Sequence, residues 1–260
     1  MRIRKWTIAR RGVQAGVLAL IASPLFGMAI FRGNLSAGTL FGINLADPPA
    51  FLQATLASRV FVPSFLGAAA VVAALYYVTG GRSFCGWVCP VYLVTELGEK
   101  LRSKLGTGQR VFSLSGTRWS LGITLALSLL VGVPFFEIVS PIGVLTRAVM
   151  FKAWQPLLLI AAIMAVELLF ARRIWCRSLC PVGGFYAMLG RYSPTRVRFV
   201  RERCTNCGDC LVACPVEEVL APSLVAAAVQ VSSGDCTRCG ACIDVCEARA
   251  LHMQCGLPEQ

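Results

Sequence analysis

The chain has 260 residues, of which 56% are hydrophobic and only 15% are charged, and its mean hydropathy is +0.67. Globular domains average roughly 45–50% apolar and about a quarter charged residues, so one water-soluble core cannot hide all of these side chains. The combination of this length with 13 cysteines also excludes a small secreted disulfide scaffold. A net charge of +12 is typical either of a nucleic-acid-binding protein or of a membrane protein with basic loops.

Four apolar stretches predict four transmembrane helices. They cover residues 12–30, 60–79, 119–136 and 154–171. Each is close to the roughly 20 residues that cross a hydrocarbon core, although the last contains Glu167. An alternative for the first stretch is a cleaved signal peptide, because a basic segment precedes it.

The basic residues predict the orientation of these stretches. All but four of the 25 Lys and Arg residues lie in residues 1–11, 80–118 and 172–260. Loops that are rich in Lys and Arg stay on the cytoplasmic side of a membrane. We therefore expect a multi-pass protein of the bacterial inner membrane whose two termini are cytoplasmic. Because the basic residues flank the apolar stretches and form no single stripe, they do not indicate a nucleic-acid partner.

The composition changes after residue 192. Residues 193–260 are polar, dense in cysteine and without a long apolar stretch. Ser193-Pro194 fits a boundary, because a proline disfavours helix in the residue before it. The sequence therefore predicts an α-helical membrane domain of four transmembrane helices over 1–192 and a separate small cytoplasmic domain over 193–260.

Eight cysteines form two runs with the same C-x2-C-x2-C-x3-C spacing. They are Cys204, Cys207, Cys210 and Cys214, followed by Cys236, Cys239, Cys242 and Cys246. Thr205 and Gly208 recur as Thr237 and Gly240, which indicates an internal duplication. Bacterial ferredoxins use this spacing for two 4Fe–4S clusters, and the fourth cysteine of each run binds the other cluster. The predicted ligand sets are therefore Cys204, Cys207, Cys210 and Cys246 for one cluster, and Cys214, Cys236, Cys239 and Cys242 for the other.

The alternatives to iron–sulfur clusters are disulfides and zinc. A cytoplasmic domain is kept reduced, which disfavours disulfides. Paired C-x2-C motifs also bind zinc, but two complete four-cysteine runs favour clusters. Metal binding would supply the folding energy that so small a domain lacks. We therefore predict an α+β ferredoxin domain of the bacterial type with two 4Fe–4S clusters.

Four more cysteines form two matched pairs, Cys85 with Cys89 and Cys176 with Cys180. Each pair lies in an R-x-aromatic-C-x3-C-P-V motif, of which the first begins at Arg82 and the second at Arg173. Each motif follows an even-numbered apolar stretch, so the predicted membrane domain is a duplicated two-helix unit. If the segments are helical, a spacing of four places both sulfurs on one face. The four thiols are candidates for a third metal site, for a redox-active dithiol pair, or for buried packing.

The order of these motifs resembles the NapH family of membrane-bound ferredoxin-type proteins. The similar segments are residues 23–27, 33–34, 40–41, 47–48, 84–90, 175–183 and both cysteine runs. MauN proteins of methylamine utilisation share this architecture. The resemblance implies an electron-transfer subunit of a quinol dehydrogenase complex and not an enzyme on its own. Such a subunit takes part in quinol oxidation and passes electrons, with a partner ferredoxin and a multihaem cytochrome, towards a periplasmic reductase such as nitrate reductase.

Quinol oxidation needs a proton acceptor, and the predicted spans hold few ionisable residues. Glu137 follows the third stretch and Glu167 lies within the fourth, so each is a candidate. The alternatives are that Glu167 pairs with Arg172 or Arg173 and that Glu137 is solvated. His252 is the only histidine, so the chain has no histidine pair to hold a b-type haem. A second functional class, an assembly or maturation factor of a periplasmic redox enzyme, also fits a protein with clusters and thiols.

Overall fold

The structure is a computed structural model. It describes residues 4–26, 31–33, 36–105, 111–151, 157–170, 172–225 and 229–256. The chain folds into two compact units, which we name the cysteine-rich unit and the helical unit. The cysteine-rich unit comprises Met1–Ala15, Leu75–Val88 and Tyr186–Gln260, and the helical unit comprises Gly16–Ala74 and Cys89–Phe185. Three separate parts of the sequence therefore build the unit that contains both cysteine runs.

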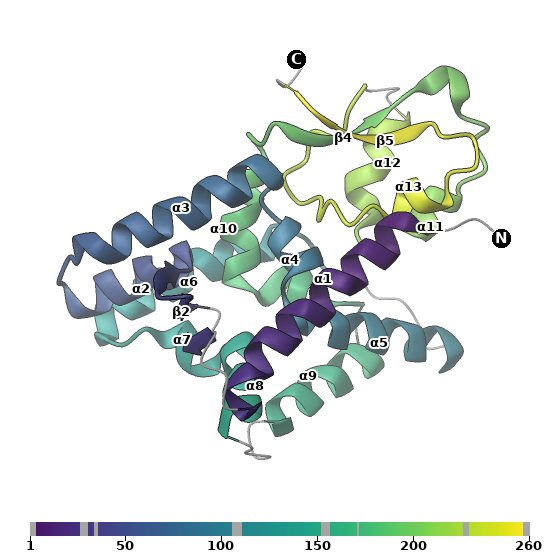
Figure 1. The fold of residues 1–260 in the computed structure, drawn as a ribbon. Helices are drawn as coiled ribbons and strands as arrows, with labels where there is room; N and C mark the ends of the chain where they lie inside the picture. Colours follow the sequence, from purple (N-terminus) through teal and green to yellow (C-terminus); the bar gives the residue numbers. More distant parts are fainter. Residues whose placement is uncertain are drawn as a thin grey trace. The chain divides into compact units, whose positions relative to one another are not determined.

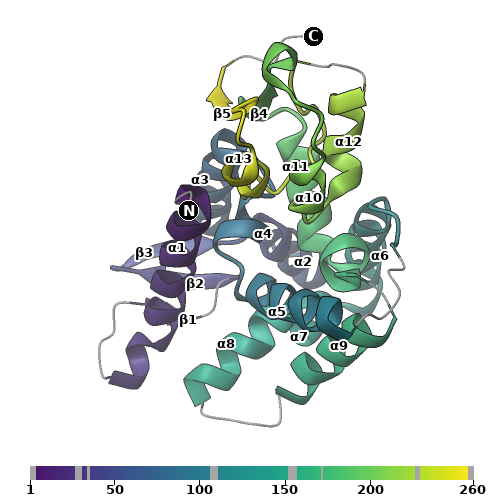
Figure 2. The ribbon, with the colours of Figure 1, turned by 90° about the vertical axis from the view of Figure 1, so that its right-hand side faces the viewer.

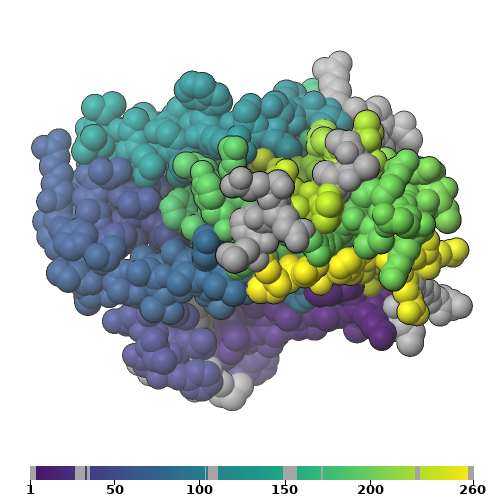
Figure 3. Space-filling model, turned by 90° about the horizontal axis from the view of Figure 1, so that it is seen from above, coloured from purple at the N-terminus to yellow at the C-terminus, as the bar shows by residue number. Residues whose placement is uncertain are grey.

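The cysteine-rich unit is organised around a two-stranded antiparallel sheet of β4 (Thr195–Phe199) and β5 (Leu251–Cys255). Val197 and Phe199 lie on one face of β4, as the strand period predicts, and are buried together with Leu251 of β5. Arg196, on the other face of β4, is also buried. Helix α12 (Glu217–Val225) belongs to the same unit (Figure 1). The shorter helical segments are α4 (Ser83–Trp87), η3 (Arg201–Arg203), α11 (Asp209–Val212) and α13 (Ala241–Val245). The end of β5 is open at the surface, where Gln254 and Cys255 are exposed (Figure 3).

The first turn of helix α1 (Lys5–Ala22) is capped by a residue from the far end of the sequence. Asp244 of α13 accepts hydrogen bonds from the backbone N–H groups of Trp6 and Thr7, at 3.0 and 2.8 Å, and from the Thr7 hydroxyl at 2.7 Å. The first N–H groups of a helix have no partner within the helix. A carboxylate at this position also stabilises the positive end of the helix dipole. Asp244 therefore fixes the start of α1 against α13.

The first C-x3-CP motif also packs within the cysteine-rich unit. Phe84 of α4, Tyr76 of helix α3 (Pro63–Thr79) and Tyr186 of helix α10 (Pro181–Gly190) form an aromatic cluster, with ring centroids 5.0–5.5 Å apart. Trp87 donates its indole N–H to the backbone carbonyl of Arg238 at 3.0 Å. The motif therefore contacts the loop that carries the second cysteine run.

The helical unit contains a three-stranded antiparallel sheet of β1 (Phe31–Gly33), β2 (Ala37–Leu40) and β3 (Ile43–Ala46). Phe41 and Gly42 connect β2 to β3, with φ of 51° and 81°. Two positive φ values are what a two-residue hairpin loop requires. The glycine meets this requirement without strain, so the hairpin is tight.

The helices of this unit pack around one another, and α5, α8 and α9 lie side by side (Figure 2). The helical elements are η1 (Ser23–Phe26), α2 (Pro48–Ser58), α5 (Pro90–Leu105), α6 (Gly116–Val131), α7 (Phe135–Val139), α8 (Pro141–Phe151), α9 (Leu157–Leu169) and η2 (Trp175–Leu179). Several begin with proline, which has a fixed φ and needs no hydrogen-bond partner for its nitrogen at the first helical position. Gln53 of α2 is buried and accepts a hydrogen bond from the backbone N–H of Phe136 at 3.1 Å, which joins α2 to α7.

The helices at the four predicted spans are too short or too charged to serve as spans. Helix α1 has 18 residues but carries Lys5, Arg10 and Arg11. Helices α3, α6 and α9 have 17, 16 and 13 residues. At 1.5 Å per residue these are about 25, 24 and 20 Å long, whereas a hydrocarbon core is about 30 Å thick. Gly132, with φ of 74°, ends α6 before the predicted stretch is complete.

Among the described residues, no helix is both long enough and apolar enough to cross a membrane. The predicted fold class of four transmembrane helices is therefore wrong, and so is the predicted multi-pass inner-membrane location with cytoplasmic termini. Residues 27–30, 154–156 and 171 of the predicted first and fourth spans lie outside the described residues, as does Asn34 of the segment that resembles NapH.

Candidate metal centres

The two cysteine runs fold into the same turn. In the first run Asn206 and Gly208 have φ of 58° and 81°, and α11 begins at the residue after the glycine. In the second run Arg238 and Gly240 have φ of 47° and 73°, and α13 begins directly afterwards. Two left-handed positions so close together curl the chain tightly, and glycine meets the second of them without a steric cost. The duplication seen in the sequence is therefore also present in the backbone.

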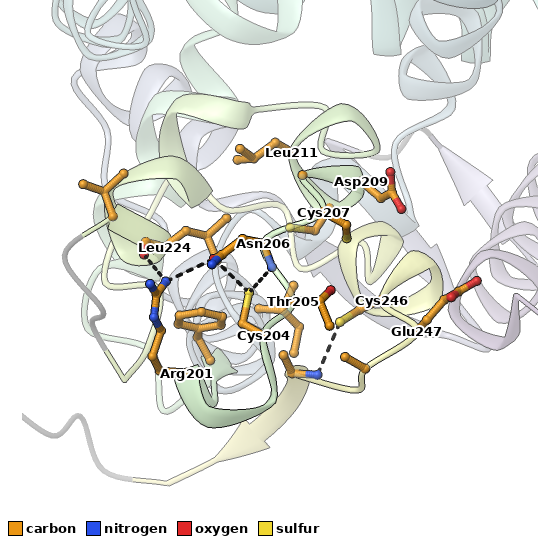
Figure 4. A pocket seen from close by; sticks show the side chains of 17 residues that line it. Arg201, Cys204, Thr205, Asn206, Cys207, Asp209, Leu211, Leu224, Cys246 and Glu247 are labelled. Atoms are coloured by element: carbon orange, nitrogen blue, oxygen red, sulfur yellow. Dashed lines mark hydrogen bonds between the residues drawn. The ribbon is translucent and has the colours of Figure 1, made fainter.

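The first cavity lies beside the first run. Cys204, Cys207 and Cys210 line it together with Cys246 of the second run, and its volume is ≈ 690 Å³ (Figure 4). Two backbone N–H groups donate to sulfur there: Asn206 to Cys204 at 3.4 Å, and Ala250 to Cys246 at 3.3 Å. Cys207 is exposed, so this cavity reaches the surface.

The second cavity is smaller and less open than the first. It is lined by the other four cysteines of the two runs, which are Cys214, Cys236, Cys239 and Cys242, and its volume is ≈ 20 Å³. Burial raises the pKa of the Cys242 thiol well above its ordinary value, and the neighbouring Cys239, Cys236 and Cys214 raise it further. Burial also raises the pKa of Cys236, although Arg238 and Arg82 oppose this increase. The Cys242 and Cys236 thiols therefore resist ionisation unless a positive charge compensates them.

Each cavity thus collects three cysteines of one run and the fourth of the other, which is the grouping that the predicted ligand sets require. Thiolate sulfur is the soft ligand that iron–sulfur clusters use, so the donor sets fit such clusters. The first cavity has room for a cubane. In the second, the sulfur atoms have to move apart, because ≈ 20 Å³ holds about one water. Among the described residues, no three Cys, His, Asp or Glu side chains are grouped to hold a single metal ion, and the ligation itself stays a prediction.

The two C-x3-CP motifs have matching local structures. Cys85 lies in α4 and Cys176 in η2, and both are partly exposed. Cys89 and Cys180 follow these segments and are buried. In each motif the proline after the second cysteine starts a helix: α5 begins at Pro90 and α10 at Pro181. Because each helical segment ends before its second cysteine, the i, i+4 arrangement on one helix face does not form.

The helical unit holds the two glutamates predicted as proton acceptors. Burial raises the pKa of Glu167 to about 7, although Arg173 opposes the increase. Its Oε1 atom is buried and has no hydrogen-bond partner among the described residues. Burial also raises the pKa of Glu137, which is half-buried, while a hydrogen bond from Ser36 and the charge of Arg147 lower it.

The expected pairing of Glu167 with Arg172 or Arg173 does not form, because a different carboxylate takes both arginines. Glu99 of α5 binds Arg172 at 2.5 Å and Arg173 at 2.6 Å. Burial acts to lower the pKa of Arg173, but Tyr92 and Glu99 more than offset this, so the pKa lies above its ordinary value. Glu99 lies 73 residues before Arg172, and no short-range motif in the sequence indicates this contact.

A buried charge cluster next to the second cavity is not predicted from the sequence. Arg82, the first residue of the first C-x3-CP motif, forms an ion pair with Asp235 at 3.0 Å, and both side chains are almost completely buried. Arg238 lines the second cavity and is 2% exposed. Burial lowers its pKa, whereas Cys236 raises it. The shared arginine of the two C-x3-CP motifs was the available signal, because Arg82 and Arg173 both form ion pairs within their own units.

Two protein-family models match this chain. The model described as "4Fe-4S binding domain" matches residues 61–108 and 153–200, and each match contains one C-x3-CP motif. The model described as "4Fe-4S dicluster domain" matches residues 196–247, which contain all eight cysteines of the two runs. The cavities and these matches define a ferredoxin-type 4Fe–4S electron-transfer protein.

Similar proteins identify the family within this class. The methylamine utilization ferredoxin-type protein MauN of Methylorubrum extorquens is 40% identical over 97% of this chain and 90% of its own length. The ferredoxin-type protein NapH of Escherichia coli is 35% identical over 94% of this chain and 88% of its own length. The chain therefore belongs to the family of ferredoxin-type proteins that includes MauN and NapH. No solved structure matches it.

Proposed function

We propose that this chain is an electron-transfer subunit that takes electrons from quinol and passes them to a redox partner through two 4Fe–4S clusters. The observation that carries the proposal is the pair of four-cysteine cavities in one unit. Each cluster, when bound, accepts and releases one electron. Oxidation of one quinol releases two electrons and two protons, so two clusters take up both electrons.

The two protons need acceptors, and Glu167 and Glu137 are the candidates in the helical unit. A carboxyl with a pKa of about 7, such as Glu167, is poised to take up and release a proton near neutral pH. Its unpartnered Oε1 atom leaves one lone pair free for an incoming proton. The raised pKa of Glu137 supports the same role more weakly.

The names of the relatives suggest which redox system the chain serves. Relatives named for methylamine utilization are 37–40% identical to it, and those named NapH are 35–36% identical. We therefore propose that the chain serves either a periplasmic reductase such as nitrate reductase, as the resemblance to NapH implies, or methylamine utilization, where the role would be that of an assembly or maturation factor. The partner ferredoxin and multihaem cytochrome belong to this proposal.

The cysteine pairs of the C-x3-CP motifs are proposed as further redox or metal ligands. Each lies within a match to the 4Fe-4S binding domain model, which supports such a role. Two 4Fe–4S clusters account for roughly eight irons per chain. We expect clearly more than eight irons per chain in the purified protein. Replacement of Cys89 and Cys180 by serine should lower the content to about eight. Iron of about eight in both proteins would contradict this role.

Redox titration tests the main proposal. Purified protein is mixed with a quinol analogue without oxygen, and cluster reduction is followed by EPR. We expect both clusters to become reduced, and the rate to fall in Glu167→Gln. Clusters that stay oxidised, together with a partner enzyme that lacks its cofactor in a deletion strain, would instead establish the second candidate function, an assembly or maturation factor.

A further inference from the structure

The two duplicated cysteine runs differ at one informative position, the residue before the second cysteine. The first run has Asn206 there and the second has Arg238. Both residues have left-handed φ values, 58° and 47°. Asparagine adopts this conformation readily, whereas a long side chain such as arginine does so rarely. A residue held in an unfavourable conformation by its surroundings suggests a role for its side chain.

Within the part of the chain that the structure describes, the guanidinium of Arg238 contacts hydrogen-bond acceptors but forms no ion pair with a carboxylate. Its guanidinium donates to the carbonyl oxygens of Cys236 at 2.7 Å, Gly190 at 3.0 Å and Thr195 at 3.3 Å. Asp235 acts on it only at longer range and is itself paired with Arg82. An arginine keeps its charge in a protein, and a buried charge without a counter-charge is costly. The fold therefore holds a fixed cation at the second cavity.

The two cavities differ in the charge of their walls. Among the described residues, Arg238 is the one charged residue that lines the second cavity, where four thiols can supply the missing negative charge. The first cavity is lined by Arg201, Asp209 and Glu247, which are all exposed and therefore screened by water. A charge acts far more strongly in an enclosed site than at a surface.

We propose that Arg238 is the counter-charge of the second cluster and raises its reduction potential above that of the first. The inference rests on the proposed function. On reduction, one electron passes from the donor to the cluster, no bond forms or breaks, and the cluster with its four thiolates gains one negative charge. Burial alone would lower the potential, but a buried cation stabilises the added charge. At equilibrium the second cluster is therefore the more reduced one. The first cluster, which lies at the surface, exchanges electrons with the partner.

An EPR-monitored redox titration of three variants tests this inference. Arg238→Asn introduces the residue of the first run, which suits the left-handed backbone. We expect the equilibrium constant for reduction of the second cluster to fall at least tenfold, a shift of about 59 mV for one electron. Arg238→Lys keeps the charge and restores most of this potential. Asn206→Arg places a cation at the first cluster and raises its potential, by less because water screens the charge.

Iron content, measured in the same samples, separates the outcomes. If Arg238→Asn holds as much iron as the wild type and neither potential moves, the inference is wrong. If Arg238→Asn loses the second cluster, the test depends on the Asn206→Arg variant. A raised reduction potential of the first cluster in that variant then supports the inference. An unchanged reduction potential of the first cluster overturns it. Wild-type protein that binds no iron after anaerobic reconstitution would instead contradict the proposed function on which the inference rests.

Discussion

The first cavity reaches the surface and carries Asn206 between its first two cysteines, whereas the second is less open and carries Arg238 at the same position. The spacing of the cysteines and the turn around them are the same in both. What differs is the charge and the burial around the sulfur atoms. A duplicated motif thus preserves its ligand geometry while its surroundings diverge, and these surroundings are what set a potential.

The largest expected difference between the cavities appears when one cysteine is removed from each. Cys207→Ser and Cys242→Ser should each lose about four irons, the content of one 4Fe–4S cluster. Metal binding also supplies folding energy, on the order of 10 kcal/mol for structural sites. We expect Cys242→Ser to lower the unfolding temperature much more, because its cavity is lined by core residues. Equal unfolding temperatures for the two variants would remove the distinction between a surface site and a core site.

A second prediction concerns the ion pair beside the second cavity. Asp235→Asn leaves the buried Arg82 without its carboxylate and should reduce the free energy of unfolding by about 3–5 kcal/mol. Glu99→Gln removes the carboxylate that pairs with Arg173 and is the matched control. It should reduce the free energy of unfolding by less, because the Glu99 side chain is 25% exposed. Denaturant titration measures both. The double variant Arg82→Met/Asp235→Asn should recover most of the loss, and a double variant as unstable as Asp235→Asn would show that the stranded charge is not the cause.

A third prediction contrasts Arg238, which keeps its charge, with Glu167, which gives its charge up. Because the folded pKa of Glu167 is raised from 4.5 to about 7, the folded state binds the proton more tightly than the unfolded state. The contribution of Glu167 to the free energy of unfolding is fully present below pH 4.5 and is lost as the pH rises to about 7. The loss amounts to about 3 kcal/mol. Glu167→Gln should abolish this pH dependence in chemical denaturation. If the free energy of unfolding of Glu167→Gln still depends on pH as in the wild type, another group causes the pH dependence.

The smallest effects separate the two glycines of the duplicated turns. Both have positive φ, so alanine costs about 1 kcal/mol at each. At Gly208 a new Cβ meets nothing within 4 Å, whereas at Gly240 it would lie 2.5 Å from the Trp6 side chain. Gly240→Ala should therefore cost roughly 1 kcal/mol more. Thermal unfolding of the two variants measures the difference, and equal costs would show that Trp6 yields without strain.

The spacing within each run is short and the turn residues at Gly208 and Gly240 are local, so the sequence is informative about which cysteines lie near one another. That these groups bind clusters stays a prediction. It did not predict the contacts of Glu167 and Arg173, since Glu99 is distant in the sequence and nothing local indicates the pair. The resemblance to the NapH family is confirmed. The ferredoxin-type 4Fe–4S chemistry of this family is indicated by cysteine motifs that are visible in the sequence.

The predicted transmembrane helices failed for a physical reason. Hydropathy records where apolar residues are continuous, but a helix begins and ends at particular residues. Helix α3 begins at Pro63, α6 ends at Gly132, and α1 includes Lys5 in its first turn. Single residues determine where a helix starts and ends. Hydropathy averaged over an apolar stretch does not contain this information.

The cap that Asp244 provides for α1 has a consequence for biosynthesis. Trp6 and Asp244 are 238 residues apart, so α1 is synthesised long before the residue that caps it. Contacts of such high sequence separation form late and slow folding. Asp244 also lies between Cys242 and Cys246, in a run that we predict to bind a cluster. The capping of α1 and the predicted cluster binding therefore involve the same short helix, α13.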